Sequence, residues 1–336
     1  MSIRIPLPLA AGLIEFWEFF LSNFQFFPSA FVHPYGMPYG TTARRDAQND
    51  GRRTTDGGGR TKDYRHKTKD RRVFTFHFIV FALSYSIMQI LLTNDDGIFA
   101  PGLAALYKEL VKIGEVLVVA PAVSHSGASH SVTFHQPLVC NKVDINGQFT
   151  GFSVQGSPAD CVKLAVMQLH KDPIDLLVAG INDGANAGIN VYYSGTVAAA
   201  MEGAFLKIPA VAMSLSHEEN MDFERAAGYC AKVLKRLMPV RSGDVINVNI
   251  PQLSKGEPKG VRVVPQSSKG FEEYYIQQKN EQGQTVFQLA GNSHRLDGAP
   301  TDTTSLEDGF ITITALASDM TNHSKTGELK ARFGEL

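Results

Sequence analysis

The chain has 336 residues and a formal net charge of −1, which gives no argument for a nucleic acid polymer or an anionic membrane as a partner. Its length suffices for one large α/β domain or two smaller ones, and its apolar fraction of 43% allows a sizeable core. The three cysteines are far apart and form no C-x-x-C pair, which argues against a disulfide framework or a zinc site and predicts a cytoplasmic location.

Residues 1–87 differ in character from the rest of the chain. Residues 43–72 carry 11 Lys and Arg against 5 Asp and Glu, with no apolar periodicity, so they cannot bury enough surface to offset chain entropy. We expect an extension that is disordered or not part of the native protein, with Met88 as the physiological start. The nearly continuous apolar run at 73–92 keeps a membrane anchor open as the alternative, although its end also fits a short buried strand.

From Met88 onward, short apolar runs alternate with amphipathic stretches. The apolar runs predict strands at residues 90–93, 116–120, 132–143, 149–154, 174–179, 210–215, 245–250, 261–264 and 310–315. Helices are predicted at residues 101–111, 157–170, 196–206 and 223–238, the second of them opened by a capping box of Ser157 and Asp160. The pair Asn146-Gly147 predicts a hairpin turn.

Alternating strands and helices indicate an α/β fold, Rossmann-like and doubly wound, with a mostly parallel sheet and a β-rich C-terminal part. We see no domain boundary after Met88. The polar region 266–308 predicts an excursion, such as an arm that packs on another subunit.

Polar residues follow three of the predicted strands. Asp95 and Asp96 come after the first strand, Ser126 follows the second, and Asn182 follows the strand at 174–179. The carboxyl ends of parallel strands share one edge of the sheet, so these oxygen donors are expected to meet there. Such donors suit Mg²⁺, Mn²⁺ or Ca²⁺ better than zinc. Each residue alone also fits a turn or a loop, and only their joint placement favours a metal site.

Ser194, Gly195 and Thr196 lie directly before a predicted helix. Their hydroxyl and amide groups point to a phosphate site at the helix N-terminus, although Ser194 or Thr196 alone could be a simple N-cap. A metal site beside a phosphate site indicates phosphoryl transfer or hydrolysis.

Other chemistries are less well supported. His125, His130 and His135 are five residues apart, a spacing that does not favour a three-histidine metal site, whereas His130 alone is a candidate general acid. The chain has no P-loop, dinucleotide fingerprint or nucleophile elbow. Two alternative functions remain. One is a nucleotide- or metal-binding module without turnover, and the other is an aspartyl-phosphate phosphatase of the haloacid-dehalogenase type, which requires a D-x-D motif where this chain has adjacent acids.

Several motifs in their usual order make the chain from Met88 onward resemble the SurE (survival protein E) nucleotidase family. They are Asn94-Asp95-Asp96-Gly97, Val119-Ala120-Pro121, the segment from Ser126 to Ser131, Gly156-Ser157-Pro158-Ala159-Asp160-Cys161-Val162, Gly180-Ile181-Asn182 with Asn186 and Gly188, and the run from Tyr193 to Gly203. The flanking residues of Ser126 depart from those of some relatives.

The resemblance implies a phosphatase that acts on nucleoside 5′-monophosphates, often on 3′-monophosphates, and in some members on short polyphosphate. It implies one divalent cation per subunit, Mg²⁺ or Mn²⁺, and a homodimer or homotetramer whose subunits exchange a C-terminal part. The nucleotidase domain is then 88–336.

The resemblance also implies a role for each residue of the site. The expected metal ligands are Asp95, Asp96, Ser126 and Asn182, and the expected phosphate-binding residues are Ser194, Gly195 and Thr196, with Asn182 beside them. From the chemistry of the site rather than from the resemblance, Asp95 and Asp96 are the expected catalytic residues, with Asp95 orienting or activating a water, and His130 is the candidate for protonating the leaving group.

Overall fold

The computed structural model describes residues 87–269, 271–294 and 299–334. The chain divides into two units, Met1–Phe78 and Ile79–Leu336, and every described residue belongs to the second. The predicted extension and most of the apolar run at 73–92 lie outside the described residues. Within the described ranges, no helix is long and apolar enough to cross a membrane.

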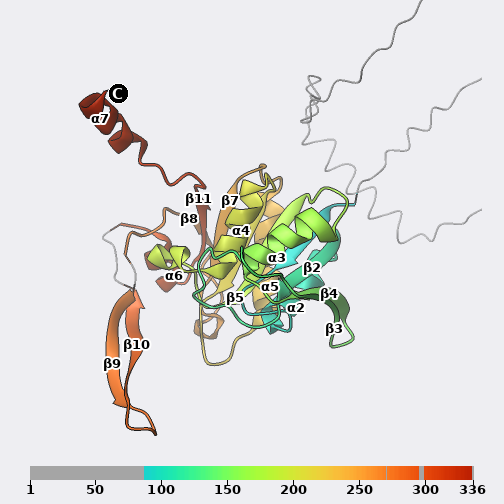
Figure 1. Cartoon of the computed structure of the whole chain (residues 1–336), viewed down its shortest axis with the longest axis horizontal. Helices are drawn as coiled ribbons and strands as arrows, with labels where there is room; N and C mark the ends of the chain where they lie inside the picture. Colours follow the sequence, from blue (N-terminus) through green and yellow to red (C-terminus); the bar gives the residue numbers. More distant parts are fainter. Residues whose placement is uncertain (1–86, 270, 295–298, 335–336) are drawn as a thin grey trace, which may run out of the picture. The chain divides into compact units, whose positions relative to one another are not determined.

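One nine-stranded sheet forms the centre of the described fold (Figure 1). Its strands are, in spatial order, β3 (Cys140–Ile145), β4 (Phe149–Val154), β2 (Glu115–Pro121), β1 (Gln89–Thr93), β5 (Leu176–Asp183), β6 (Ala210–Leu215), β7 (Val245–Ile250), β11 (Ile311–Leu316) and β8 (Val261–Val263). The strands from β4 to β7 all pair in parallel, whereas β3 and β11 run antiparallel to β4 and β7. The prediction of a mostly parallel sheet is confirmed.

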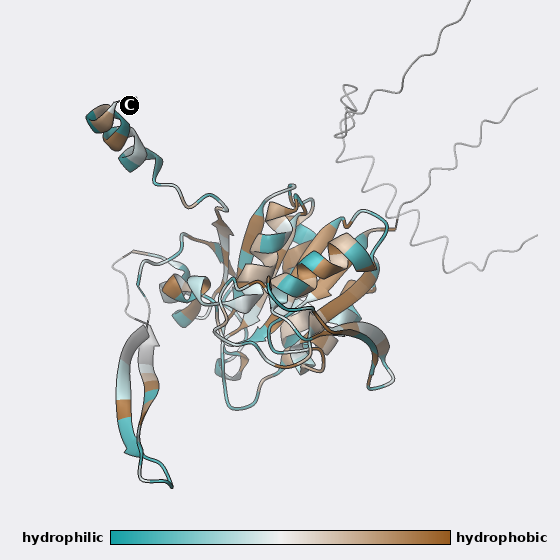
Figure 2. Ribbon diagram, viewed as in Figure 1, coloured by the Kyte–Doolittle hydropathy of each residue, from teal (hydrophilic) through white to brown (hydrophobic). Residues whose placement is uncertain are grey.

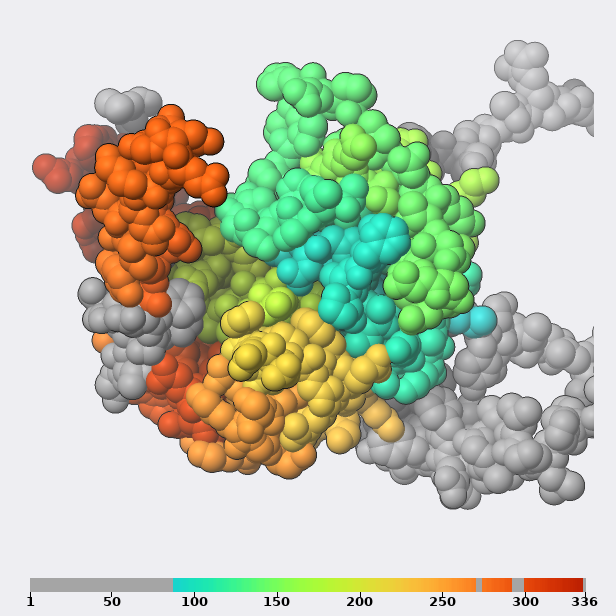
Figure 3. All heavy atoms as spheres, turned by 90° about the horizontal axis from the view of Figure 1, so that it is seen from below, coloured from blue at the N-terminus to red at the C-terminus, as the bar shows by residue number. Residues whose placement is uncertain are grey.

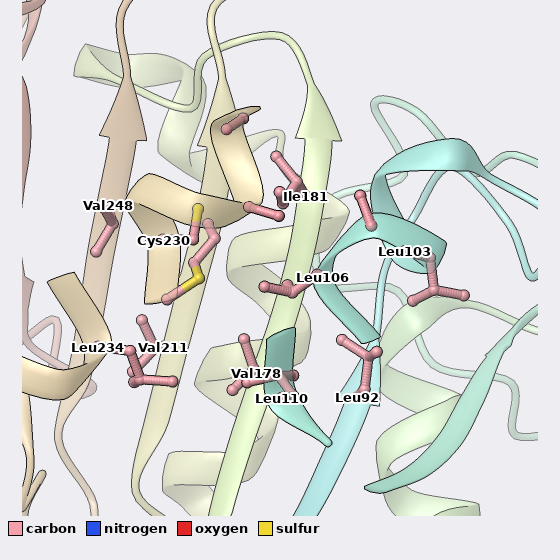
Figure 4. Close-up of a cluster of buried hydrophobic side chains, with 14 of the residues drawn as sticks. Leu92, Leu103, Leu106, Leu110, Val178, Ile181, Val211, Cys230, Leu234 and Val248 are labelled. Atoms are coloured by element: carbon pink, nitrogen blue, oxygen red, sulfur yellow. The ribbon is translucent and has the colours of Figure 1, made fainter. Parts of the chain in front are cut away.

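Helices cover both faces of this sheet, as expected for a doubly wound fold. They are α2 (Pro101–Leu110) and α5 (Phe223–Leu237) on one face, and α3 (Pro158–Leu164) and α4 (Gly195–Phe205) on the other. Figure 4 shows how leucines of α2 meet Cys230 and Leu234 of α5 over Val178, Val211 and Val248 of the sheet. In Figure 2 the central strands are mostly hydrophobic, because both of their faces are buried.

The order of the strands creates a switch point beside β1. The chain adds β2 and β4 on one side of β1 and then returns to add β5 and β6 on the other side. Ligands of open α/β sheets bind in the crevice outside the carboxyl ends of such strands. The loops that follow β1 and β5 therefore flank the expected binding position.

Local sequence signals account for several boundaries. The capping box is present, with the Ser157 side chain accepting from the Asp160 amide at 3.1 Å and the Asp160 carboxylate accepting from the Ser157 amide at 2.9 Å. Asn146 and Gly147 adopt φ values of 53° and 68°, as a two-residue hairpin turn requires, and they join β3 to β4.

Two predicted boundaries were wrong. Residues 132–139 form no strand, because side chains of α3 bind this part of the backbone in place of a neighbouring strand: Ser157 Oγ donates to the Ser131 carbonyl at 2.6 Å, and the Asp160 carboxylate accepts from the Thr133 amide at 2.9 Å. The strand predicted at 174–179, which is β5, continues past residue 179 and includes Asn182.

Three elements lie in the described part of the predicted excursion at 266–308. The strands β9 (Phe271–Lys279) and β10 (Thr285–His294) pair with each other in a separate two-stranded sheet, and α6 (Asp302–Glu307) follows them. The last helix, α7 (His323–Phe333), contains no buried residue. Three short helical segments, at Ala165–Leu169, Gly188–Tyr192 and Leu253–Lys255, complete the described elements.

Candidate functional site

The turn after β1 buries a pair of adjacent acids. Asn94 closes the turn, since its side chain donates to the Gly97 carbonyl at 2.9 Å and accepts from the Gly97 amide at 3.2 Å. Gly97 has a φ of 107°, which few residues with a side chain adopt. Asp95 is 3% exposed and Asp96 is half-buried. The turn is therefore built to hold both carboxylates at the edge of the sheet.

These two acids have no cationic partner in the described part of the chain. None of its Lys, Arg or His side chains forms an ion pair with Asp95 or Asp96. Burial raises the pKa of Asp95, although a hydrogen bond from Thr196 opposes that rise. Burial, assisted by the negative charges of Asp95 and Asp183, raises the pKa of Asp96 to about 6. A bound cation would remove this repulsion.

The end of β5 lies against the acidic turn. The Asp183 amide donates to Asp96 Oδ2 at 3.0 Å, which joins the loops after β1 and β5 as the switch point predicts. Asn182 is 8% exposed, and its amide nitrogen donates to the Gly184 carbonyl at 2.7 Å. With its nitrogen so engaged, the side-chain oxygen of Asn182 is left as the group that can accept or coordinate.

The segment 122–139, between β2 and β3, carries Ser126, and we call it the serine loop. Its near end is fixed to the acidic turn, since the His125 amide donates to the Asp95 carbonyl at 2.8 Å. The Ser126 hydroxyl lies 3.0 Å from that of Ser124. This places the predicted hydroxyl ligand beside the predicted carboxylate ligands.

The N-terminus of α4 closes the site from another side. Ser194 caps the helix by accepting from the Val197 amide at 3.0 Å. The Thr196 hydroxyl donates to Asp95 Oδ1. At Gly195 there is no room for a side chain, since a Cβ atom would lie 2.8 Å from Asp95 Cβ and 3.0 Å from its Oδ2. Only glycine allows the carboxylate to lie so close to the helix N-terminus.

A cavity of about 540 Å³ is lined by part of this set, since Asp96, Gly195 and Thr196 are not among its lining residues. Its lining includes Asp95, Ser126, Asn182 and Ser194, which come from four different segments. It is completed by loops that follow β6 and β7 and by α6. Figure 3 shows the cyan segment after β1 close to the yellow segment after β6 and the orange segment after β7 on one face of the molecule. A volume of this order suits a small organic ligand.

Two residues of the cavity were missed by the sequence analysis. His217, after β6, has its Nδ1 atom 2.7 Å from Asp183 Oδ1, and both side chains line the cavity. They are 34 residues apart in the sequence. Only the parallel pairing of β5 with β6 brings them together, so no local motif could have revealed the pair.

His130 lies elsewhere. It is not among the residues that line the cavity, its Nε2 atom lies 2.9 Å from Glu202, and its ring stacks on Phe205 at 5.5 Å. The structure therefore gives no support to a role of His130 as the general acid. The other two histidines of the predicted spacing, His125 and His135, form no metal cluster with it in the described residues.

The donor set fits a hard divalent cation. No group of three or more His, Cys, Asp or Glu side chains among the described residues could hold a metal. A metal at this site would thus need the Ser126 and Asn182 oxygens as well as Asp95 and Asp96. Two carboxylates, a hydroxyl and an amide oxygen are the ligands that Mg²⁺ and Mn²⁺ favour, and the unpaired buried carboxylates supply the negative charge.

The fold and this site together define the class. The chain is a doubly wound α/β protein with its ligand cavity at the switch point, where one of two adjacent acids, Asp95, contacts the N-terminus of a helix.

Comparison with known proteins identifies the family. The model of the family described as Survival protein SurE matches residues 90–273. The 5′-nucleotidase SurE of Rhodopirellula baltica is 42% identical over 247 residues, which are 72% of this chain and 98% of that protein. The 5′-nucleotidase SurE of Syntrophus aciditrophicus is 40% identical over 248 residues, 73% of this chain and 93% of that protein.

A solved structure agrees with the observed fold. The crystal structure of the SurE protein from Aquifex aeolicus is 36% identical and superimposes with a TM-score of 0.64, covering 73% of this chain and 99% of that one. The chain belongs to the SurE family, as its motifs predicted.

Proposed function

We propose that this protein is a divalent-metal-dependent 5′-nucleotidase, which hydrolyses nucleoside 5′-monophosphates to nucleoside and phosphate. Family membership and the names of the relatives support nucleotidase activity. The observation that carries the metal dependence is the pair of adjacent acids, buried Asp95 and half-buried Asp96, which have no cationic partner in the described residues.

The residues divide between two tasks. Asp95, Asp96, Ser126 and Asn182 would hold one Mg²⁺ or Mn²⁺ ion per subunit, which when bound supplies Lewis-acid polarisation of the phosphoryl group and of a water. Ser194, Gly195 and Thr196, at the start of α4, would bind the phosphate, since a helix N-terminus favours anions. The cavity shared by Asp95, Ser126, Asn182 and Ser194 supports these assignments, and Asp96 is added for its place next to Asp95 and its donor chemistry.

Asp95 connects the proposed metal site to the proposed phosphate site. Thr196 donates to its Oδ1 atom, so the carboxylate is held in one orientation at the start of the phosphate site. A carboxylate fixed in this way can orient the attacking water as well as bind the ion. The Thr196 hydroxyl proton is committed to Asp95, and the backbone amides of Thr196 and Gly195 also hydrogen-bond to this carboxylate.

Exposed apolar side chains support a homodimer or a homotetramer. In the hairpin of β9 and β10, Tyr275, Phe287 and Leu289 are 67%, 61% and 53% exposed, and in α7 Phe333 is 64% exposed. Apolar groups gathered on elements without a core of their own mark surfaces that another chain covers. We propose that these two elements form the contacts between subunits.

Two further assignments complete the proposal. Residues 88–336 form the nucleotidase domain, which is supported by the position of the first strand at Gln89 and by the 98% coverage of the R. baltica relative. A cytoplasmic location fits the three cysteines, which are all free.

The test is phosphate release from a panel of nucleoside 5′- and 3′-monophosphates and short polyphosphate, measured with Mn²⁺, with Mg²⁺ and with EDTA. We expect release from 5′-monophosphates with either metal and none with EDTA. Binding of a nucleotide without phosphate release would establish a binding module instead. Equal turnover with EDTA would remove the metal from the reaction.

A further inference from the structure

A buried carboxylate that the proposed chemistry does not use lies behind the phosphate site. Glu202 is on α4, about two turns after Ser194. Its side chain is 4% exposed, with Lys163 Nζ at 2.6 Å from one oxygen and His130 Nε2 at 2.9 Å from the other. Glutamates are seldom buried so completely unless they are paired.

Glu202 carries its negative charge at neutral pH. Burial raises its pKa, but the hydrogen bonds and charges of His130 and Lys163 outweigh burial and lower the pKa below its ordinary value. A charged carboxylate in such a place holds its partners firmly, because removal of either leaves a buried charge poorly compensated.

The three partners come from three separate segments. Lys163 belongs to α3, Glu202 to α4 and His130 to the serine loop. Two of these segments are helices that already pack side by side on the sheet. The serine loop has neither helix nor strand, so its position depends on the individual contacts that it makes.

Those contacts hold the loop on both sides of His130. The Ser129 amide and hydroxyl donate to the carbonyls of Tyr193 and Tyr192 at 3.0 and 2.7 Å, next to the start of α4. On the other side, α3 binds Ser131 and Thr133. Among the described residues of the loop, His130 alone makes an ion pair, and its ring also stacks on Phe205 of α4.

We propose that Glu202 is a positioning residue, which together with Lys163 fixes His130 and thereby holds the serine loop, with Ser126, against the cavity. This inference rests on the proposed function, since it takes Ser126 as a metal ligand. It assigns His130 to the support of the site rather than to proton transfer. The carboxylate joins the loop that carries one ligand to the helix whose N-terminus binds the phosphate.

The most selective variant is His130→Phe. It keeps a ring that can stack on Phe205 and leaves the pair between Glu202 and Lys163 intact, so the two helices stay joined. His130→Gln is the conservative variant, since its amide can still donate to Glu202. Glu224→Ala is the matched control, because it breaks an ion pair with Lys108 that joins α2 to α5 on the opposite face of the sheet.

Three measurements are made on the full chain: hydrogen exchange of peptides from the serine loop, Mn²⁺ affinity by calorimetry, and kcat and KM at saturating Mn²⁺. Residues that orient metal ligands from behind typically change metal affinity by about 10- to 100-fold. We therefore expect His130→Phe to raise the Mn²⁺ dissociation constant about 10-fold and to speed exchange in the loop. The KM for nucleotide should stay within about threefold, because the phosphate site is untouched.

His130→Gln should restore much of the affinity and the protection, and Glu224→Ala should resemble the wild type in all three measurements. Wild-type exchange and wild-type Mn²⁺ affinity in His130→Phe would overturn the proposal. So would faster exchange in α3 and α4 with an unchanged serine loop, since that would give the network a purely structural role. If the wild type itself binds no Mn²⁺, the proposed function fails, whereas loop exchange still reports whether His130 holds the loop.

Discussion

Gly195→Ala is the smallest change that reaches the centre of the site. The added methyl would lie 2.8 Å from Asp95 Cβ and 3.0 Å from Asp95 Oδ2. Ordinary van der Waals contact begins at 3.4 Å, so the added methyl and Asp95 Cβ must move apart by about 0.6 Å, the difference between 3.4 and 2.8 Å. Either the carboxylate leaves the N-terminus of α4 or the helix moves away from the carboxylate.

The expected effect follows from that displacement. A misplacement of about 1 Å in a catalytic arrangement can cost roughly 100-fold, so we expect kcat to fall by about 10- to 100-fold. Overpacking should also lower the free energy of unfolding by about 1–3 kcal/mol. Phosphate release, Mn²⁺ calorimetry and urea unfolding measure the three quantities.

Gly203→Ala is the matched control for overpacking in the same helix. Its methyl would lie 2.9 Å from Cδ1 of Leu177, a fully buried apolar side chain, and it contacts no carboxylate. It should cost a similar amount of stability while kcat stays within about twofold. Wild-type kcat and Mn²⁺ affinity in Gly195→Ala would refute the claim that the glycine lets Asp95 lie against the phosphate site.

Three further predictions concern pH, a capping residue and assembly. Burial is the main cause that raises the pKa of Asp96 to about 6, so protons should compete with the metal for Asp96 below that pH. The Mn²⁺ affinity should therefore fall by up to about 10-fold per pH unit in that range. Calorimetry from pH 5 to 8 measures this, and a constant affinity would contradict the prediction. Burial raises the pKa of Asp160, but hydrogen bonds from Thr133 and Ser157 outweigh burial, so the pKa lies below its ordinary value. The Asp160 carboxylate therefore contributes to the free energy of unfolding above the unfolded pKa near 3.8, and this contribution is lost as pH falls through the folded pKa. Asp160→Asn should therefore lose about 1 kcal/mol of unfolding free energy at pH 7 and progressively less toward pH 3, as urea unfolding would show, whereas a gap independent of pH would point to packing. Tyr275→Glu should dissociate the oligomer in light scattering, while Gln282→Glu in the hairpin turn should not, and an unchanged mass for Tyr275→Glu would exclude β9 from the interface.

Much of the core fold could be predicted because its signals are local. The strands β1, β5 and β6 are largely apolar runs buried on both faces, and the capping box at Ser157 uses residues only three positions apart. The predicted strand over 132–139 failed because the serine loop pairs with side chains of α3, which no pattern of alternation reveals. The hairpin of β9 and β10 was also hidden, since those of its residues whose burial is described are nearly all exposed and show no buried face.

The candidate site could be predicted to the extent that it depends on strand order. Asp95 follows β1 and Asn182 lies near the end of β5, two strands that lie side by side in the parallel sheet, and the Asp183 amide at the end of β5 donates to Asp96. The pair of His217 with Asp183 and the partners of Glu202 could not be found, because each joins residues far apart in the sequence. His130 lies in the motif from Ser126 to Ser131, but its proposed role in positioning the serine loop depends on Glu202, which is 72 positions away in the sequence.

The central claim is that Asp95 and Asp96 hold a metal on which hydrolysis depends. Its most direct test is Mn²⁺ binding and phosphate release from a nucleoside 5′-monophosphate by the wild type, Asp95→Asn and Asp96→Asn, with folding checked by urea unfolding. The account predicts Mn²⁺-dependent release by the wild type and a loss of at least about 100-fold in each variant, with weaker Mn²⁺ binding and an intact fold. Wild-type metal-dependent release by either variant would remove that residue from the site.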